Sequence, residues 1–459
     1  MAGINDLQQI QLRRNNMATA IQSAVSEPAG IDELLLYRRI AWRILPLTIV
    51  CFLFSYFDRI NISFAKTQMQ AELGLSDAAY GFAASIFFFG YVLFEVPSSY
   101  GLKRYGAPSW ICRIMVSWGL ATAALVFAYN EYTLYFLRFL IGVMEAGFGP
   151  ALLFYLACWF PKKNLASMNG IWFLSIPLAG VLGAPVSGLI LEYMNGFLGL
   201  AGWHWLFVLS GLPCSLLGIV VLYKLDRDIQ SAKWLTQDEK DVLQRNLDND
   251  RKASNPIQAS LFKVIFTRQV AVLSVIYFMI KLTGYGLNFW MPHLIGASGI
   301  KSELTVGFLT ALPYLVAAIG MIIVTRRSDA TGERRKYLWL CMMVGGVGYF
   351  AACYFNDHYI LLTSFLVLAT AGVFIAIPIF WTIPQQAFTG LAIAGGIAAV
   401  NTVGQLSGMV APLLVGYIND VSGNTYMGML ALAPFCFLCA GLIYWGLPDD
   451  RKASKRVVA

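Results

Sequence analysis

The sequence predicts an all-α integral membrane protein with twelve transmembrane helices arranged as two halves of six. The chain of 459 residues is 58% hydrophobic and only 13% charged, whereas about 25% of residues are charged in an ordinary soluble domain. Twelve apolar windows have the length of about 20 residues that a spanning helix needs. A long polar stretch, residues 224–266, separates the sixth window from the seventh.

The windows follow one another along the chain with short polar connections. Those of the first half lie at roughly 41–63, 78–99, 107–128, 132–156, 165–191 and 203–223. Those of the second half lie at roughly 268–292, 303–325, 337–355, 359–383, 390–417 and 425–447. Equal halves indicate an internal repeat, as in many transporters. The predicted units are a tail 1–40, a half 41–224, a linker 225–267, a half 268–447 and a tail 448–459.

The linker contains one predicted element of its own. Thr236 and Glu239 have the spacing of a capping box, in which the first residue caps a helix and the fourth reaches back to it. The sequence therefore predicts a short amphipathic helix that runs to about Leu247 on the cytoplasmic face.

The basic residues orient the chain, because positively charged loops stay in the cytoplasm. With both termini inside, 27 of the 33 basic residues are cytoplasmic, four lie within helices, and Lys66 and Lys301 face outward. This distribution accounts for the net charge of +8 through contact with anionic lipid headgroups rather than nucleic acid. The polar first 40 residues contain no signal peptide, so the first helix directs membrane insertion.

Four charged residues of the first half stand well inside predicted helices, away from the cytoplasmic ends where Glu95 and Arg113 lie, and a charge there costs several kcal/mol unless it faces a cavity or a partner. Arg138 and Glu145 are seven residues apart and therefore share a helix face, whereas the neighbours Asp58 and Arg59 diverge by about 100°. The acids can take and release protons, and the arginines are permanent counter-charges. A static salt-bridge network between helices one and four is the alternative.

In the second half, Lys281 lies near the middle of helix seven, and its partner is either a substrate carboxylate or a structural group. Tyr285 and Asn288 beside it offer hydrogen bonds. In helix eleven, Asn401 and Gln405 lie at i and i+4 on one face. These amides suit recognition of a polyol or carboxylate, or else they tie two helices together.

Other classes of function lack their residues. The sequence has no GxxxxGK loop and no paired histidines, and the eight cysteines are scattered through apolar windows. We therefore expect neither an enzyme nor a bound cofactor or metal. The tails are too short to hold a signalling domain, which argues against a receptor.

Several runs resemble the anion:cation symporter family of the major facilitator superfamily, in the same order over nearly the whole chain. They are DRINISFA (58–65), RFLIGVMEAGFGP (138–150) followed by WFPKK, GWHWLF (202–207) and FWTIP (380–384). The basic loops at 101–106 and 326–335 resemble the superfamily's cytoplasmic loop signature.

The resemblance implies roles for particular residues. Asp58 and Glu145 match the family's proton-titrating positions, Arg138 its substrate or coupling arginine, and Arg59 a partner in the same network. The residues that match lining positions of the sugar-acid site are Tyr56, Tyr91 and Asn401. Lys281 departs from the pattern, where an apolar or amide residue is usual, and this suggests an additional anionic group on the substrate.

The expected function is therefore a proton-coupled symporter, a monomer in the bacterial inner membrane, that imports a small organic anion by alternating access. The expected substrate is a sugar acid (aldonate, hexuronate or aldarate) or a tartrate-like hydroxy-dicarboxylate, and protons are favoured over sodium. An aromatic carboxylate of the hydroxyphenylacetate or phthalate type is the alternative, because Trp381 and Tyr285 suit either class.

Overall fold

The fold was analysed in a computed structural model that describes residues 32–161, 173–253, 267–387 and 391–447. Within these ranges the chain forms helices and no strand, and twelve helical segments are long and apolar enough to cross a membrane. The all-α class and the number of spans are thus confirmed.

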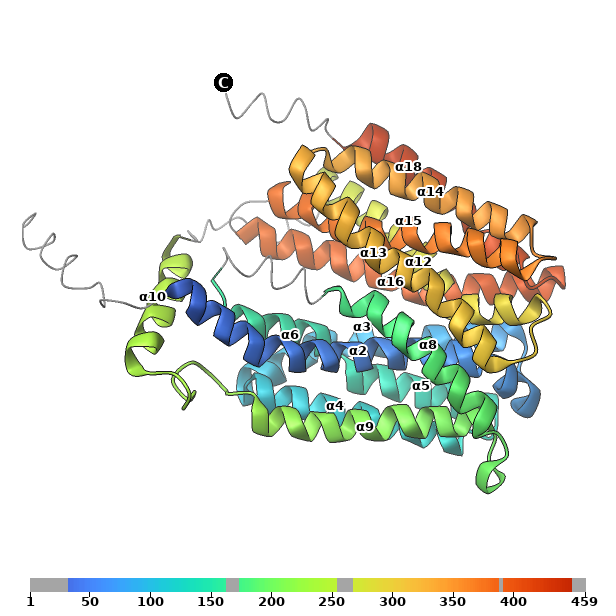
Figure 1. The fold of residues 1–459 in the computed structure, drawn as a ribbon, viewed down its shortest axis with the longest axis horizontal. Helices are drawn as coiled ribbons and strands as arrows, with labels where there is room; N and C mark the ends of the chain where they lie inside the picture. The colour runs from blue at the N-terminus through green and yellow to red at the C-terminus, as the bar shows by residue number, and fades with distance from the viewer. Residues whose placement is uncertain (1–31, 162–172, 254–266, 388–390, 448–459) are drawn as a thin grey trace, which may run out of the picture.

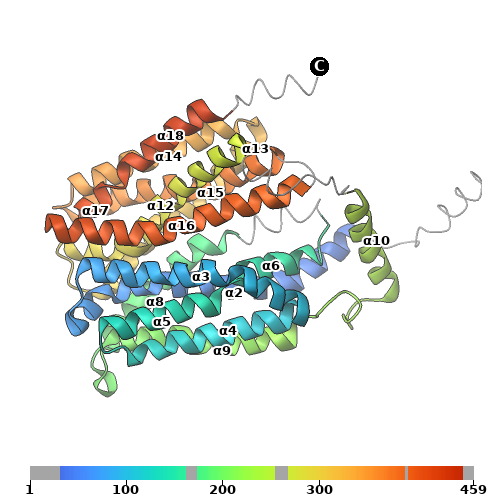
Figure 2. The same ribbon diagram turned by 180° about the vertical axis from the view of Figure 1, so that it is seen from behind.

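Two bundles lie side by side, one blue to green and the other yellow to red (Figures 1 and 2). The first contains α2 (Glu33–Leu73), α3 (Asp77–Tyr105), α4 (Ala107–Ala123) with η1 (Ala124–Phe127), α5 (Glu131–Glu145), α6 (Phe148–Ala157), α8 (Ser175–Tyr193) and α9 (Gly202–Lys224). The second contains α12 (Arg268–Ala297), α13 (Glu303–Thr331), α14 (Arg334–Tyr354), α15 (Tyr359–Ala387), α16 (Leu391–Ser422), α17 (Met427–Leu430) and α18 (Ala433–Gly446). A short turn, η2 (Phe197–Gly199), precedes α9, and α10 (Gln237–Ala253) lies between the bundles in sequence.

The two ends of the molecule differ. We call the end that carries α10 the linker end, and the opposite end, with the turns at 74–76, 194–201, 298–302 and 423–426, the far end (Figure 1). Odd-numbered spans run from the linker end to the far end, and even-numbered spans return. The N-termini of α3 and α13 and the C-termini of α8 and α16 therefore all lie at the far end.

The first helix is longer than its predicted window. Asp32 caps it by accepting hydrogen bonds from the backbone N–H groups of Leu34 and Leu35, and Gly74 ends it in the left-handed conformation, with φ of 65°. Lys66, predicted to lie on the outer side of the membrane, is inside this helix toward the far end, with none of its surface exposed. The polar residues after position 63 continue the helix rather than ending it.

The fourth span consists of two helices rather than one. The break falls at Ala146 and Gly147, where Gly147 has φ of 82°, and α6 begins directly after it. A Cβ on Gly147 would lie 2.4 Å from Ser98 Oγ, so only glycine fits this turn. Pro150 sits in the first turn of α6, where its missing N–H costs nothing. Glu145 is consequently the last residue of α5.

The linker helix begins as predicted and extends further, to Ala253. Thr236 Oγ1 accepts from the Glu239 N–H at 3.3 Å, and a Glu239 carboxylate oxygen accepts from the Thr236 N–H at 3.0 Å. Glu239 also pairs with Arg39, and Asn246 donates to Tyr37 at 3.1 Å. These partners belong to α2, so the linker helix is attached to the first bundle.

Candidate functional site

An ion pair joins α2 to the end of α5. Arg59 donates through Nε and Nη2 to one oxygen of Glu145, at 2.8 and 2.6 Å, and Ser55 donates to the same oxygen at 2.8 Å. The Glu145 side chain is fully buried, and its second oxygen has no hydrogen-bond partner among the described residues. The carboxylate thus holds one permanent cation and keeps a free acceptor position.

Asp58 turns to a different helix, as the 100° offset from Arg59 predicts. Its carboxylate accepts from Thr122 of α4 at 2.8 Å and from Asn61 at 3.2 Å, and Asn61 also donates to Ser210 of α9 at 3.0 Å. Asp58 is 3% exposed. No cation of the described chain lies within salt-bridge distance of it, so this acid is held by neutral donors alone.

Arg138 is a buried cation with incomplete partners. It is 1% exposed, and its Nε donates to the carbonyl oxygen of Ala83 at 3.4 Å. Its guanidinium lies 5.1 Å from the centre of the Phe87 ring, and its Nη2 has no hydrogen-bond partner within the described ranges. Arg59 stacks near the same ring at 5.6 Å and on Tyr91 at 4.8 Å. Phe87 therefore stands beside both arginines.

The two bundles meet at Asn288. Its amide nitrogen donates to the Tyr56 hydroxyl at 2.7 Å, and its amide oxygen accepts from the Tyr314 hydroxyl at 2.7 Å. Tyr56 belongs to α2, whereas Asn288 and Tyr314 belong to α12 and α13. The amide thus joins the two halves through both of its polar atoms in this conformation.

Lys281 has an aromatic partner rather than an acidic one. Its ammonium lies 4.4 Å from the centre of the Tyr285 ring, and no described carboxylate lies within salt-bridge distance. The Tyr285 hydroxyl donates to Gln405 of α16 at 2.7 Å, so Gln405 ties two helices together here. Among the described residues Asn401, one turn earlier, makes no side-chain hydrogen bond. Lys281 and Asn401 are therefore two polar groups of this half that remain available.

Trp381 belongs to an aromatic cluster beside Lys281. Its indole N–H donates to the Tyr277 hydroxyl at 3.2 Å, and its ring centre lies 4.8 Å from that of Tyr277. Tyr277 in turn stacks on Phe380 at 4.9 Å. The cluster forms a flat apolar wall with one polar rim.

The predicted residues thus form two groups that aromatic rings connect. Asp58, Arg59, Arg138, Glu145 and Tyr91 lie in the first bundle, and the others gather around α12, with Tyr56 reaching across. The ring centres of Phe87 and Phe88 are 5.0 Å apart, and those of Phe88 and Tyr285 are 4.7 Å apart. Across both groups, three cations stand against two carboxylates.

Sequence reasoning missed the neutral partners in both groups. They are Ser55, Thr122, Tyr277 and Tyr314. A hydroxyl in an apolar helix carries no signal by itself, because it can bond to the carbonyl of its own preceding turn. Ser55 lies one turn before Arg59, and this i and i+4 spacing is the one pattern that could have drawn attention to it.

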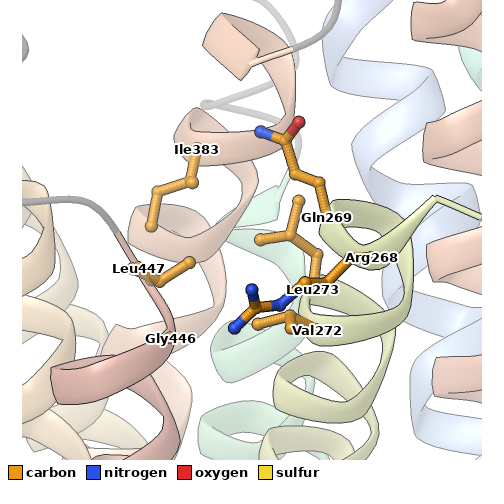
Figure 3. Close-up of a pocket in the computed structure, with 7 residues that line it drawn as sticks. All are labelled: Arg268, Gln269, Val272, Leu273, Ile383, Gly446 and Leu447. Carbon is orange, nitrogen blue, oxygen red and sulfur yellow. The ribbon is translucent and has the colours of Figure 1, made fainter.

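Two cavities lie elsewhere. One of about 310 Å³ opens at the linker end of the second bundle and is lined by Arg268, Gln269, Val272, Leu273, Ile383, Gly446 and Leu447 (Figure 3). Another, of about 790 Å³, is a groove between α3 and α16 whose wall includes Phe82, Phe89 and Leu413. None of the predicted site residues lines either one, and the part of the chain that the structure describes holds no cluster of metal-ligating residues.

Comparison with known proteins agrees with this architecture. The model of the Major Facilitator Superfamily matches residues 48–412 and 302–459. A protein of Agrobacterium vitis named as a tartrate transporter is 37% identical over 86% of this chain and 91% of its own. An inner membrane transport protein of Escherichia coli K12 is 33% identical over 91% and 96%. A quinolone resistance transporter of Acinetobacter baumannii is 35% identical over 86% and 91%.

Solved structures show the same fold. The xylose transporter of E. coli, in a partially occluded inward-open conformation, superposes with a TM-score of 0.71 at 12% identity, over 89% of this chain and 98% of that one. A bacterial homologue of the human lysosomal transporter Spinster gives 0.71 at 16% identity, over 90% and 97%. On the family match, the relatives and the twelve-span fold together, the chain belongs to the Major Facilitator Superfamily.

Proposed function

We propose that this protein is a proton-coupled symporter that imports a small organic anion by alternating access, and that it is not an enzyme. The observation that carries the proposal is a pair of cations inside the bundles, buried Arg138 and partly buried Lys281, that have no acidic partner among the described residues. A buried charge is retained where it has a partner or a function. An anion from outside the protein is the partner that both side chains lack.

The two acids, Asp58 and Glu145, couple proton binding to anion binding. With both carboxylates ionised, the two groups carry a net charge of +1, and each proton bound raises that charge by one. Asp58 lacks an ion pair and Glu145 keeps a free oxygen, so both have room for a proton. Protonation therefore strengthens the attraction for the anion, which links the two fluxes.

The favoured substrate is a sugar acid or a hydroxy-dicarboxylate. Arg138 offers a guanidinium that matches a carboxylate, and Arg59 and Tyr91 lie beside it. Tyr56, Asn288, Asn401 and Gln405 provide amide and phenol groups that suit hydroxyls. The tartrate transporter among the relatives supports this class. An aromatic carboxylate is the second candidate, because Trp381 and Tyr277 present a flat wall beside Lys281.

The proposed topology places both termini in the cytoplasm of a bacterial cell, so that the far end is extracellular. The mobile units are residues 41–224 and 268–447, joined by the linker 225–267, and the tails 1–40 and 448–459 lie outside them. Support comes from the basic residues, which cluster at the linker end, and from the bacterial relatives. A monomer suffices, because one chain contains both halves of the site.

The central experiment is transport by Glu145→Gln in proteoliposomes. The variant should lose accumulation driven by a pH gradient while it still exchanges labelled substrate across the membrane, because the anion site remains but the titratable group is gone. Ser55→Ala is the matched control, since it removes one hydrogen bond to the same oxygen and keeps the acid. Unchanged proton-driven accumulation in Glu145→Gln would contradict the coupling role. A panel of tartrate, gluconate, galacturonate, phthalate and hydroxyphenylacetate in counterflow identifies the substrate class.

A further inference from the structure

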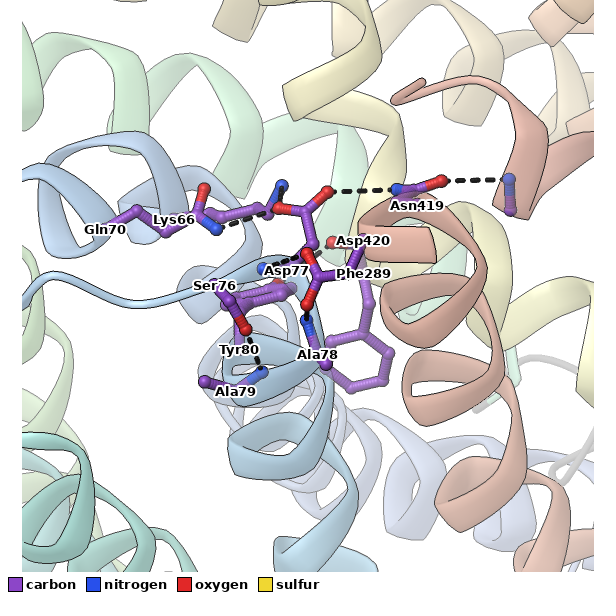
Figure 4. Close-up of polar contacts among 11 residues, drawn as sticks. Lys66, Gln70, Ser76, Asp77, Ala78, Ala79, Tyr80, Phe289, Asn419 and Asp420 are labelled. Atoms are coloured by element: carbon purple, nitrogen blue, oxygen red, sulfur yellow. Dashed lines mark hydrogen bonds and ion pairs between the residues drawn. The ribbon is translucent and has the colours of Figure 1, made fainter. Parts of the chain in front are cut away.

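Two contacts at the far end join the halves through a carboxylate and a helix N-terminus. In the first, Asp420 near the end of α16 accepts from the backbone N–H of Asp77 at 3.0 Å and from that of Ala78 at 2.9 Å, one with each oxygen (Figure 4). These are the first two residues of α3. Asn419 donates to the Asp77 carboxylate at 3.1 Å, and Lys66 pairs with the same carboxylate at 2.8 Å. A carboxylate of the second half thus caps a helix of the first.

The second contact reverses the roles of the halves. Glu192, near the end of α8 in the first half, accepts from the N–H of Leu304 at 2.9 Å and from the hydroxyl of Ser302 at 2.6 Å. Ser302 is the N-cap residue of α13, whose first turn these groups form. A carboxylate of the first half therefore caps a helix of the second.

Glycines bring the backbones of α3 and α16 together beneath the first contact. We call the line along which two such helices touch a seam, so that α3 and α16 form the first seam and α8 and α13 the second. A Cβ on Gly81 of α3 would lie 2.4 Å from the Pro412 carbonyl oxygen, and one on Gly416 of α16 would lie 2.3 Å from the Asp77 carbonyl oxygen. Real Cβ atoms do not approach a backbone atom so closely. The two helices consequently touch only because each presents a glycine to the other.

The second seam has the same construction. A Cβ on Gly307 of α13 would lie 2.5 Å from the Ala184 carbonyl oxygen, and one on Gly188 of α8 would lie 2.5 Å from the Glu303 carbonyl oxygen. Again each helix presents one glycine to a backbone oxygen of the other.

The positions correspond along the sequence. Each capped helix has a serine N-cap whose side chain accepts from the N–H three residues on, and the seam glycine follows the serine by five residues. Each capping acid follows its own seam glycine by four residues. The corresponding sets are Ser76, Gly81, Gly416 and Asp420 in one seam, and Ser302, Gly307, Gly188 and Glu192 in the other.

We propose that these two contacts, which we call the far-end clamps, together hold the two halves in contact at the far end. They thereby set the equilibrium between the closed and the open far end. The first N–H groups of a helix have no partner within the helix, and a carboxylate satisfies them and complements the helix dipole. When the halves separate at the far end, both clamps must break and both acids must find water instead. Under the proposed orientation, this opening is the step that admits substrate from outside.

The clamps hold the two halves relative to each other and lie away from the proposed substrate site. Asp420 and Glu192 lie at helix ends, whereas the proposed binding residues lie within the spans. Removal of either acid should therefore change the ratio of open to closed far end and leave the binding groups in place. The loss of a helix cap corresponds to about a fivefold change in an equilibrium constant. Because the seams share no residue, the effects of the two clamps should multiply, to roughly 25-fold.

The test measures the far-end distance in substrate-free protein, so its result does not depend on the proposed transport reaction. Spin labels introduced as a non-canonical amino acid at Tyr129 and Asp357, on far-end turns of the two halves, report the distance by pulsed electron resonance and leave the native cysteines untouched. Asp420→Ala and Glu192→Ala should each raise the ratio of long to short distances about fivefold. Glu131→Gln is the matched control, because the carboxylate of this far-end acid accepts a hydrogen bond from Tyr135 of its own helix and from no residue of the other half within the described ranges.

Two results would overturn the proposal. One is a distance distribution in either Asp420→Ala or Glu192→Ala that equals that of the wild-type protein. The other comes from Glu192→Gln, which keeps one oxygen able to accept from both Ser302 and Leu304 and should open less than Glu192→Ala. A glutamine variant as open as the alanine variant would show that the hydrogen bonds do not hold the seam. Each seam is tested by its own variants. If a variant of one seam fails to fold, the variants of the other seam still decide the outcome.

Discussion

Gly142 offers a sharp test of how the arginine site is supported. A Cβ added to this residue of α5 would lie 2.0 Å from the carbonyl oxygen of Phe87, whereas ordinary contact begins at 3.4 Å. Gly142→Ala must therefore separate α3 and α5 by roughly 1.4 Å at this point. Overpacking of this kind costs about 1–3 kcal/mol, and the better helix propensity of alanine returns up to about 1 kcal/mol.

A net loss of about 1–2 kcal/mol should lower the midpoint of thermal unfolding in detergent by about 2–8 °C for a unit the size of the first half. Uptake should fall as well, because the shifted segment carries Phe87, whose ring lies beside both Arg59 and Arg138. Scanning fluorimetry and uptake by the reconstituted variant measure the two effects.

Gly149→Ala is the control for this prediction. It makes the same change one helix later, but its Cβ would meet only the Tyr91 hydroxyl at an ordinary 3.9 Å. Its stability should be unchanged or slightly higher. If Gly142→Ala unfolds at the wild-type temperature and transports normally, then the close approach of α3 and α5 does not support the site, and the steric reasoning fails.

Three further predictions concern single side chains. Lys281→Gln should weaken binding of a dianion in counterflow far more than that of a monoanion, and equal losses would remove Lys281 from the substrate site. Thr122→Val should lower stability by about 1.5–3 kcal/mol at pH 8, where it removes a hydrogen bond to an ionised Asp58, and by about 1 kcal/mol in acid; a cost independent of pH in denaturant unfolding would argue against titration of Asp58. Burial raises the pKa of Glu239, but the Thr236 N–H and the Arg39 guanidinium outweigh it and lower that pKa overall. The attachment of the linker helix should therefore be complete above the usual glutamate pKa and weaken as the pH falls through the lowered value, and hydrogen exchange of this helix should show no such dependence in Glu239→Gln.

The sequence predicted the fold because span length, charge distribution and helical spacing are local properties. The divergence of Asp58 and Arg59 follows from helix geometry alone, and the structure confirms it. The pairing of Arg59 with Glu145, rather than with its neighbour Asp58, could not be read from spacing, because it depends on how α2 and α5 are placed against each other. Gln405 likewise meets Tyr285 only through the packing of α12 against α16.

The far-end residues escaped prediction for another reason. Asp420 and Glu192 stand at helix ends, where an acid is unremarkable, and their partners are backbone N–H groups that no sequence pattern marks. The break before α6 was also not predicted, because the requirement for glycine at position 147 arises from the neighbouring Ser98.

The far-end clamps are related to each other as the two equal contacts of a symmetric dimer, in which a patch on one subunit meets the same patch on its copy. Both seams contain a serine, an acid and two glycines at the same spacing. The second half supplies the accepting acid in one seam, and the first half supplies it in the other. A single six-helix unit that carried one serine, one acid and their two glycines would contain everything needed to close against a duplicate of itself. The covalent linker then only keeps the two halves close together, because each half by itself contains the residues that pair with the other.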